Sequence, residues 1–576
     1  MNPGVYLALI LGFYSVACQD VFVTVNEGTL RGSLTRVEDK DLEVYLGVPY
    51  AEPPVGERRF QRPVSPSSWE GPRDATLYGP ACLQRDLKPQ FNVTMGEDCL
   101  YLNVYTSARS KSEATLPVVV FIHGGTFLTG SGSFFNPSML AVRDVVMVTI
   151  NYRLNVLGFL STGDAAAPGN FGMMDQVMAL TWIRDNIAKF GGNPGDVTIM
   201  GYSAGSASVS LHLLSPLSRG LFRKVIAQSG SSMADWAAAS PHDEVSPRDV
   251  AFTLASEVNC TGSDSETVVT CLRGVSVEDI VNAGRNIPRP PRRFTWSPVI
   301  ETLYGFLPDS PRALAERGQA ANVPIMIGVN KDEFSRSVAV LPGSNDGVNA
   351  SVFRNKIFEF ASEGYPGYKY TVSMAMAKTY LKYWMDHLAV RASYVNFLTD
   401  YYFTAPAILE SELLTSRPGR RPLYFYRLAH RPANNPDPQW QGTSHNIGLL
   451  LYTFGVPIIG PGGYSWRWTW SWTEADKEFS RVVMNMTVNF VKYGNPTPTE
   501  VGGVIWEPFT ASERRYLYLD STSVMKSDLR PDDMKFWNKD IPDIIGEPVA
   551  SPSSASVDSQ IPLIALLFTV FSLTLQ

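Results

Sequence analysis

The stretch Thr198-Ile199-Met200-Gly201-Tyr202-Ser203-Ala204-Gly205-Ser206 places a serine between two glycines in the pattern Gly-x-Ser-x-Gly. The residues before it, Asp196–Met200, are mostly apolar or β-branched and predict a strand, and the residues after it are typical of a helix. A sharp strand-to-helix turn of this kind exposes the serine hydroxyl at the edge of a sheet. Because glycines on either side let strand and helix pack closely, we predict that Ser203 is a catalytic nucleophile.

A serine nucleophile needs a base that takes its proton, and the chain has 6 histidines. His445 lies in the short polar segment Gly442–Asn446, after the predicted strand Leu423–Tyr426. Loops at the carboxyl ends of parallel strands are where such sheets place their chemistry, so His445 is the base that we predict. The other histidines are expected in a glycine turn (His123), in the packing of a helix (His212) or on the surface (His242, His387 and His430).

The acid that orients the histidine should lie between the serine and the histidine, because sheets with this serine turn order the three groups in that way. The apolar segment Val323–Asn330 is typical of a buried strand, and Lys331-Asp332-Glu333-Phe334 follows it directly. Two adjacent carboxylates therefore have the right position. The spacing does not choose between Asp332 and Glu333.

A further glycine-rich turn lies upstream of the serine. The apolar segment Val118–Ile122 predicts a strand and ends in His123-Gly124-Gly125-Thr126-Phe127. Without side chains in the way, backbone N–H groups of such a loop can approach a carbonyl oxygen and stabilise the negative charge that develops on it. We expect this loop to form an oxyanion hole.

Length and charge limit the class of protein. The chain has 576 residues and a net charge of −6, without long basic runs, which argues against nucleic acid as a partner. Predicted strands such as Val145–Ile150 alternate with helical segments such as Asp175–Lys189. This alternation predicts an α/β fold with a mostly parallel central sheet and helices on both faces. The predicted chemistry needs no cofactor and no metal.

Both ends of the chain carry signals for the secretory pathway. An apolar run with small residues at its end predicts a signal peptide over 1–18. At the other end, the small-residue and proline-rich linker 546–560 precedes the uncharged apolar tail 561–576. This tail is shorter than the ~20 residues that span a bilayer, so we expect a signal for a glycolipid (GPI) anchor at the cell surface. A short tail anchor is the alternative; the main domain is expected over 20–545.

Several longer motifs resemble those of the type-B carboxylesterases, a family that includes cholinesterases, bile-salt-activated lipase and the catalytically inactive neuroligins. Glu97–Val104 is similar to the second signature of the family, and Phe190–Pro194 and Gln228–Ser231 lie at similar places around the serine. The resemblance runs from about Val25 to Trp537. It implies an α/β-hydrolase fold and a serine esterase that acts on a small-molecule ester.

The resemblance also implies roles for individual residues. Ser203 would be the nucleophile, Glu333 the acid and His445 the base. The remaining implied residues are the oxyanion N–H donors Gly125, Thr126 and Ala204 and the disulfides Cys82–Cys99 and Cys260–Cys271. Four asparagines begin N-x-S/T acceptors for glycosylation: Asn92, Asn259, Asn349 and Asn485. A homo-oligomer is compatible with the sequence.

Three departures from the family bear on the substrate. Tyr202 stands where most members have glutamate, the segment after His445 lacks the usual acidic residue, and no tryptophan lies between Cys82 and Cys99. A carboxylate and an aromatic face hold quaternary ammonium groups. We therefore expect uncharged carboxylic esters as substrates, with a cholinesterase-like enzyme or a neuroligin-like adhesion protein as alternatives.

The segment Trp466–Trp472 has four tryptophans at a period of two, which predicts a strand with one aromatic face. Such a strand could line the mouth of the site, bind a partner or pack as a hairpin.

Overall fold

The computed structural model describes residues 19–84, 94–107, 115–445, 448–456 and 471–546. The predicted signal peptide, most of the linker and the apolar tail lie outside these residues, as do Asn92 and Trp466–Trp470. Among the described residues, no helix is long and apolar enough to cross a membrane.

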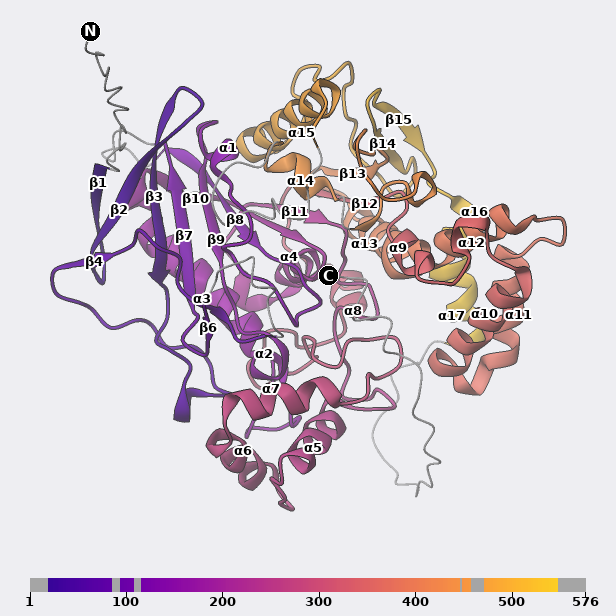
Figure 1. The fold of residues 1–576 in the computed structure, drawn as a ribbon, viewed down its shortest axis with the longest axis horizontal. Helices are drawn as coiled ribbons and strands as arrows, with labels where there is room; N and C mark the ends of the chain where they lie inside the picture. The colour runs from indigo at the N-terminus through magenta and orange to yellow at the C-terminus, as the bar shows by residue number, and fades with distance from the viewer. Residues whose placement is uncertain (1–18, 85–93, 108–114, 446–447, 457–470, 547–576) are drawn as a thin grey trace, which may run out of the picture.

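One sheet of 13 strands organises the chain (Figure 1). Its spatial order is β1 (Gln19–Val25), β2 (Gly28–Val37), β3 (Lys40–Pro49), β7 (Tyr101–Thr106), β9 (Val146–Ile150), β8 (Leu116–Ile122), β10 (Gly192–Tyr202), β11 (Lys224–Gln228), β12 (Ile325–Asn330), β13 (Leu423–Leu428), β14 (Arg515–Leu519) and β15 (Val524–Ser527), with β4 (Pro72–Asp74) beside β2. In this spatial order, the seven strands from β9 to β14 run parallel to one another. Antiparallel strands flank them on both sides. The predicted fold class, a mostly parallel sheet with helices, is confirmed.

Helices cover the sheet on both faces. One face carries α3 (Phe171–Asn186), α4 (Ala204–Leu214) and α13 (Ala405–Thr415), and the other carries α1 (Ser138–Ala141), α14 (Leu449–Thr453) and α15 (Glu474–Tyr493). The remaining helices are α2 (Asn155–Phe159), α5 (Pro247–Glu257), α6 (Ser265–Gly274), α7 (Val277–Asn286), α8 (Pro311–Glu316), α9 (Ser335–Ala339), α10 (Ala350–Gly364), α11 (Lys369–Tyr380), α12 (His387–Thr399), α16 (Pro531–Lys535) and α17 (Ile541–Ile545).

The period of two along a strand explains the two cores. In β8, Val118 and Val120 belong to the large core shared with α3 and α4. Val119 and Phe121 belong to the second core, which includes Phe479 of α15. Because successive side chains of a strand point to opposite faces, an apolar run in a central strand fills both layers. This is why the central strands read as continuous apolar segments in the sequence.

The register of the parallel strands brings their carboxyl ends to one edge. Tyr202, the last residue of β10, pairs with Gln228 at the end of β11. Gln228 in turn pairs with Gly328 of β12, which pairs with Tyr426 of β13. The loops that leave β8, β10, β12 and β13 therefore meet at the same edge of the sheet, and Gly125, Ser203, Glu333 and His445 lie in these four loops in that order.

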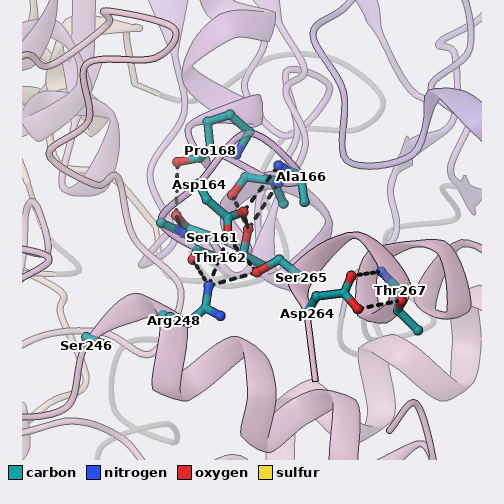
Figure 2. Close-up of polar contacts among 12 residues, drawn as sticks. Ser161, Thr162, Asp164, Ala166, Pro168, Ser246, Arg248, Asp264, Ser265 and Thr267 are labelled. Carbon is teal, nitrogen blue, oxygen red and sulfur yellow. Dashed lines mark hydrogen bonds and ion pairs between the residues drawn. The ribbon is translucent and has the colours of Figure 1, made fainter. Parts of the chain in front are cut away.

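A polar cluster attaches α5 and α6 to the loop after α2 (Figure 2). The Asp164 carboxylate accepts hydrogen bonds from Ser265 Oγ at 2.5 Å and from Arg248 Nη1 at 2.9 Å. Arg248 also donates to the carbonyl oxygen of Thr162 at 2.8 Å. The disulfide Cys260–Cys271 ties the segment before α6 to that helix. This part of the chain, at the bottom of Figure 1, is thus fixed to the body of the molecule.

Candidate active site

Ser203 lies on the turn between β10 and α4, with φ 57° and ψ −124°. Its N–H donates to the carbonyl oxygen of Gln228 at 2.9 Å. The flanking glycines are required by contact: an added Cβ at Gly201 would lie 2.0 Å from the oxygen of Gly205, and one at Gly205 would lie 2.0 Å from the oxygen of Ile122. A strained serine in such a packed turn is typical of a nucleophile elbow.

The structure brings Ser203, His445 and Glu333 together from three different loops. Ser203 Oγ is 3.0 Å from His445 Nε2, and His445 Nδ1 is 2.7 Å from Glu333 Oε2. The other oxygen of Glu333 accepts the Asn330 N–H at 2.7 Å, and the Glu333 carbonyl accepts the His445 N–H at 3.0 Å. Glu333 is 2% exposed, so its carboxylate is shielded from water. A hydroxyl, an imidazole and a carboxylate in this order can transfer a proton from the serine.

Asp332, the other candidate acid, has a different place. Its Oδ2 accepts the N–H of Thr443 at 3.1 Å, and an added Cβ at Gly442 would lie 2.0 Å from the same oxygen. Burial raises the pKa of the Asp332 carboxyl. Asp332 therefore holds the backbone at the start of the loop that carries His445, and it does not contact the imidazole.

The loop after β8 lies directly against the serine turn. An added Cβ at Gly124 would lie 2.4 Å from the oxygen of Tyr202 and 2.9 Å from Ser203 Cβ. Within the described residues, the N–H groups of Gly125 and Thr126 have no acceptor. The N–H of Ala204, at the first position of α4, has no acceptor inside its helix. The three expected oxyanion donors thus come from two elements that meet at Ser203.

Two aromatic side chains enclose the imidazole of His445. The ring of Tyr202 is stacked on it, with centroids 4.9 Å apart, and the Tyr202 hydroxyl contacts the His445 carbonyl oxygen. Phe403 lies 4.8 Å from the imidazole and belongs to the π-helical turn Asp400–Thr404 before α13. Nothing in the sequence singles out Phe403, because a π-helical turn shows no periodicity of its own.

The other histidines are placed as expected, with one exception. His123 is buried against Tyr152, and burial lowers its pKa to about 4. His212 is bonded on both ring nitrogens inside the helical layer. The prediction for His430 is wrong: it is buried, with Nε2 3.1 Å from Asp476 Oδ1 at the start of α15. Its local sequence is polar and proline-rich, but the distant helix α15 covers it.

The structure contains the disulfides Cys82–Cys99 and Cys260–Cys271. Of the four glycosylation acceptors, Asn259, Asn349 and Asn485 are exposed. Among the described residues, no cluster of three or more histidine, cysteine, aspartate or glutamate side chains could hold a metal ion.

A parallel sheet with a serine elbow, an imidazole and a carboxylate at its carboxyl edge defines an α/β-hydrolase fold. The model of the carboxylesterase family matches residues 19–537. The chain belongs to this family.

Individual relatives give the same result. Neuroligin-2 of Mus musculus is 34% identical over 86% of this chain and 64% of its own length. Neuroligin-3 of the same species is 33% identical over 94% of this chain and 72% of its own length. Cholinesterase of Mus musculus is 33% identical over 92% of this chain and 88% of its own length. The chain thus spans less than two thirds of neuroligin-2.

Proposed function

We propose that this protein is a serine carboxylic ester hydrolase that acts on uncharged esters through an acyl-enzyme. The observation that supports the proposal is the continuous contact from Ser203 Oγ to His445 Nε2 at 3.0 Å and from His445 Nδ1 to Glu333 Oε2 at 2.7 Å. Strained backbone positions cluster at active sites, and Ser203 has φ 57° and ψ −124°.

In the proposed reaction, Ser203 Oγ attacks the ester carbonyl carbon while His445 Nε2 takes the hydroxyl proton. The carbonyl oxygen becomes negative and is stabilised by the N–H groups of Gly125, Thr126 and Ala204. When the tetrahedral intermediate collapses, the ester C–O bond breaks and His445 gives its proton to the leaving alcohol. Glu333 keeps the imidazole in the required tautomer and stabilises the imidazolium.

Water then completes the cycle. His445 takes a proton from a water molecule, whose oxygen attacks the acyl carbon, and the bond from the acyl group to Ser203 Oγ breaks. The proton returns to Ser203, and a carboxylic acid leaves. Each step uses only groups of this chain and water, so the reaction needs no cofactor.

We place this activity outside the cell. The proposed signal peptide 1–18 directs the chain into the secretory pathway, where the disulfides form. The catalytic domain 20–545 is then followed by the linker 546–560 and the tail 561–576, which we propose is exchanged for a glycolipid anchor.

A cell-surface adhesion protein is the second candidate. It is favoured by the similarity to neuroligin-2 and neuroligin-3. Adhesion and hydrolysis do not exclude one another, and the intact contacts of Ser203 favour hydrolysis as the primary function.

The test uses the full chain expressed in cells and a panel of esters that differ in acyl and alcohol groups. We expect hydrolysis by the wild type, and covalent labelling by a fluorescent organophosphonate. Ser203→Ala should abolish both while surface expression stays normal, since loss of such a nucleophile typically removes ~10⁶ in kcat. Labelling of another serine in the variant, or no hydrolysis of any ester by the wild type, would reject the proposal.

A further inference from the structure

Two buried amide side chains, Gln84 and Asn151, lie between the first disulfide and the loop with the proposed oxyanion donors. Both are nearly inaccessible to water, as are Cys82 and Cys99. Buried amides in folded proteins are hydrogen-bonded, so their partners show which segments they hold together.

Gln84 joins the Cys82 side of the disulfide to Gly130. Its Nε2 donates to the carbonyl oxygen of Cys82 at 2.9 Å and to that of Gly130 at 2.8 Å, and its Oε1 accepts the Gly130 N–H at 2.8 Å. The side chain thus satisfies both backbone groups of Gly130, as a neighbouring strand would. Gly130 has φ +127°, and an added Cβ there would lie 2.5 Å from the oxygen of Gly124. The position of Gly130 is therefore tied to the start of the glycine-rich loop.

Asn151 makes the equivalent connection from the Cys99 side. It follows β9, and its Nδ2 donates to the carbonyl oxygen of Cys99 at 3.2 Å. Its Oδ1 accepts the N–H of Gly132 at 2.8 Å and the hydroxyl of Ser131 at 3.0 Å. Residues 130–132 are thus held by two amides, each of which also binds a carbonyl group of one half-cystine.

Residues 130–132 directly follow the loop that contains the proposed oxyanion donors. The N–H groups of Leu128 and Thr129 donate to the Gly125 carbonyl oxygen at 2.9 and 3.0 Å. Thr126 and Phe127 have φ 58° and 59°, a conformation that costs free energy for side chains of their size. Strain of this kind persists only where surrounding contacts impose it. The two amides supply such contacts at the end of the loop.

We propose that Gln84 and Asn151 are positioning residues that connect the Cys82–Cys99 cross-link to the oxyanion loop. By holding residues 130–132, they keep the N–H groups of Gly125 and Thr126 directed toward the atom that Ser203 attacks. This inference rests on the proposed function, because it assigns a role within the ester hydrolysis described above.

The proposal predicts an effect on the chemical step. Oxyanion donors stabilise the transition state only if they are already in place, and a misplacement of 1 Å can cost ~10²-fold in rate. Gln84→Ala and Asn151→Ala should therefore each lower kcat by roughly 10- to 100-fold and leave KM within about twofold. A trifluoromethyl ketone, which forms a tetrahedral adduct with the serine, should bind more weakly by the same factor as kcat/KM falls.

Asn170 offers a matched control. Its buried amide makes the same pair of bonds to another residue: Nδ2 donates to the Val299 carbonyl oxygen at 2.8 Å, and Oδ1 accepts the Val299 N–H at 2.8 Å. Asn170 has φ 59°, so glycine is the substitution that avoids strain. Asn170→Gly should lower thermal stability but keep kcat.

Hydrogen exchange gives a readout that does not depend on activity. In Gln84→Ala, the peptide that contains residues 124–130 should exchange faster than in the wild type, and in Asn170→Gly it should not. If Gln84→Ala fails to fold, Gln84→Glu keeps the acceptor for the Gly130 N–H, removes both donors and serves in its place.

These outcomes separate the two proposals. A wild type that hydrolyses no ester rejects the proposed function, and the exchange of residues 124–130 still decides whether Gln84 holds the loop. An active wild type with unchanged kcat in both amide variants overturns this inference and leaves the proposed function intact. Equal losses of kcat in Asn170→Gly and Gln84→Ala would also overturn it, because the effect would then be one of general stability.

Discussion

The adjacent carboxylates of Asp332 and Glu333 contact two different parts of the loop that carries His445. Glu333 Oε2 lies 2.7 Å from His445 Nδ1, and Asp332 Oδ2 accepts the Thr443 N–H at 3.1 Å. The Glu333 carboxylate therefore faces the imidazole, whereas the Asp332 carboxylate holds the backbone at Thr443, two residues before His445.

This arrangement predicts unequal effects of two conservative substitutions. Glu333→Gln should lower kcat by ~10⁴, because an amide cannot hold the imidazole tautomer that accepts the serine proton. Asp332→Asn keeps an oxygen that can accept the Thr443 N–H and should lower kcat much less. Steady-state kinetics on one ester measure both. A larger loss of kcat in Asp332→Asn than in Glu333→Gln would show that Asp332, and not Glu333, is the acid.

The residues around His445 predict how the proposed esterase activity depends on a positive charge in the substrate. Tyr202 replaces the usual glutamate and lies flat against the imidazole, with ring centroids 4.9 Å apart. A choline ester and its uncharged isostere with a carbon in place of nitrogen should therefore have kcat/KM values within about threefold. A desolvated cation–π contact is worth ~2 kcal/mol, so a true choline site would give roughly a thirtyfold preference. That preference would require an aromatic cage elsewhere in the chain.

Much of the fold could be predicted because central strands and the serine turn are local patterns. The predicted strand Val118–Ile122 lies within β8, and Asp196–Met200 lies within β10. The apolar runs are visible since both faces of these strands are buried. The helix expected at Asp175–Lys189 begins four residues earlier, at Phe171, where an asparagine in left-handed conformation precedes it. Asparagine is among the residues favoured directly before a helix, but Asn170 makes no capping hydrogen bond with its side chain.

The site could be predicted only in part, because its geometry depends on contacts between distant segments. The choice between Asp332 and Glu333 follows from how the His445 loop lies against β12, which no local pattern records. Gln84 and Phe403 were missed for the same reason: a single buried amide and a single aromatic residue have no signature in the sequence. The surface position predicted for His430 was wrong because α15, which covers this residue, begins more than forty residues further along the chain.

A further prediction concerns the proposed anchoring of the protein to the cell surface. The apolar tail is too short to span the hydrocarbon core of a bilayer comfortably and follows a small-residue linker. Cells that express the full chain should therefore show esterase activity on their outer surface, and phosphatidylinositol-specific phospholipase C should release it. Activity that resists the phospholipase and needs detergent would indicate a tail anchor.

A truncated chain provides the control. A chain that ends after Pro548 should be secreted freely and remain active, because it keeps Ile544 and Ile545 of α17, the last described residues that pack against the core. Activity found only in the medium of cells with the full chain would reject tethering altogether.

The last prediction concerns Glu410, a buried carboxyl group of α13 that contacts α4, the helix that follows Ser203. Its Oε2 accepts the hydroxyls of Ser231 at 2.5 Å and Ser210 at 3.1 Å, and its Oε1 accepts that of Ser232 at 3.0 Å. Burial raises the pKa of Glu410, although the three hydroxyls oppose this shift. The folded state therefore keeps a proton that the unfolded chain has lost, over a window that begins at the ordinary carboxyl pKa of 4.5.

Since the folded state binds more protons in that window, the contribution of Glu410 to the free energy of unfolding decreases as pH rises. Each unit by which the folded pKa is raised corresponds to about 1.4 kcal/mol once the pH is well above it. Glu410→Gln removes this titration, and the hydroxyl facing its NH₂ can turn to accept a hydrogen bond. Its melting temperature relative to wild type should increase from pH 4.5 to pH 8. Glu410→Ala removes the acceptor of the buried Ser210 and Ser232 hydroxyls, whereas the Ser231 hydroxyl still has the Pro406 carbonyl oxygen at 3.2 Å. This variant should be destabilised at every pH, by ~1–3 kcal/mol for each group that stays unsatisfied. If the difference in melting temperature between Glu410→Gln and wild type is constant across the pH range, burial does not raise the pKa of the Glu410 carboxyl group.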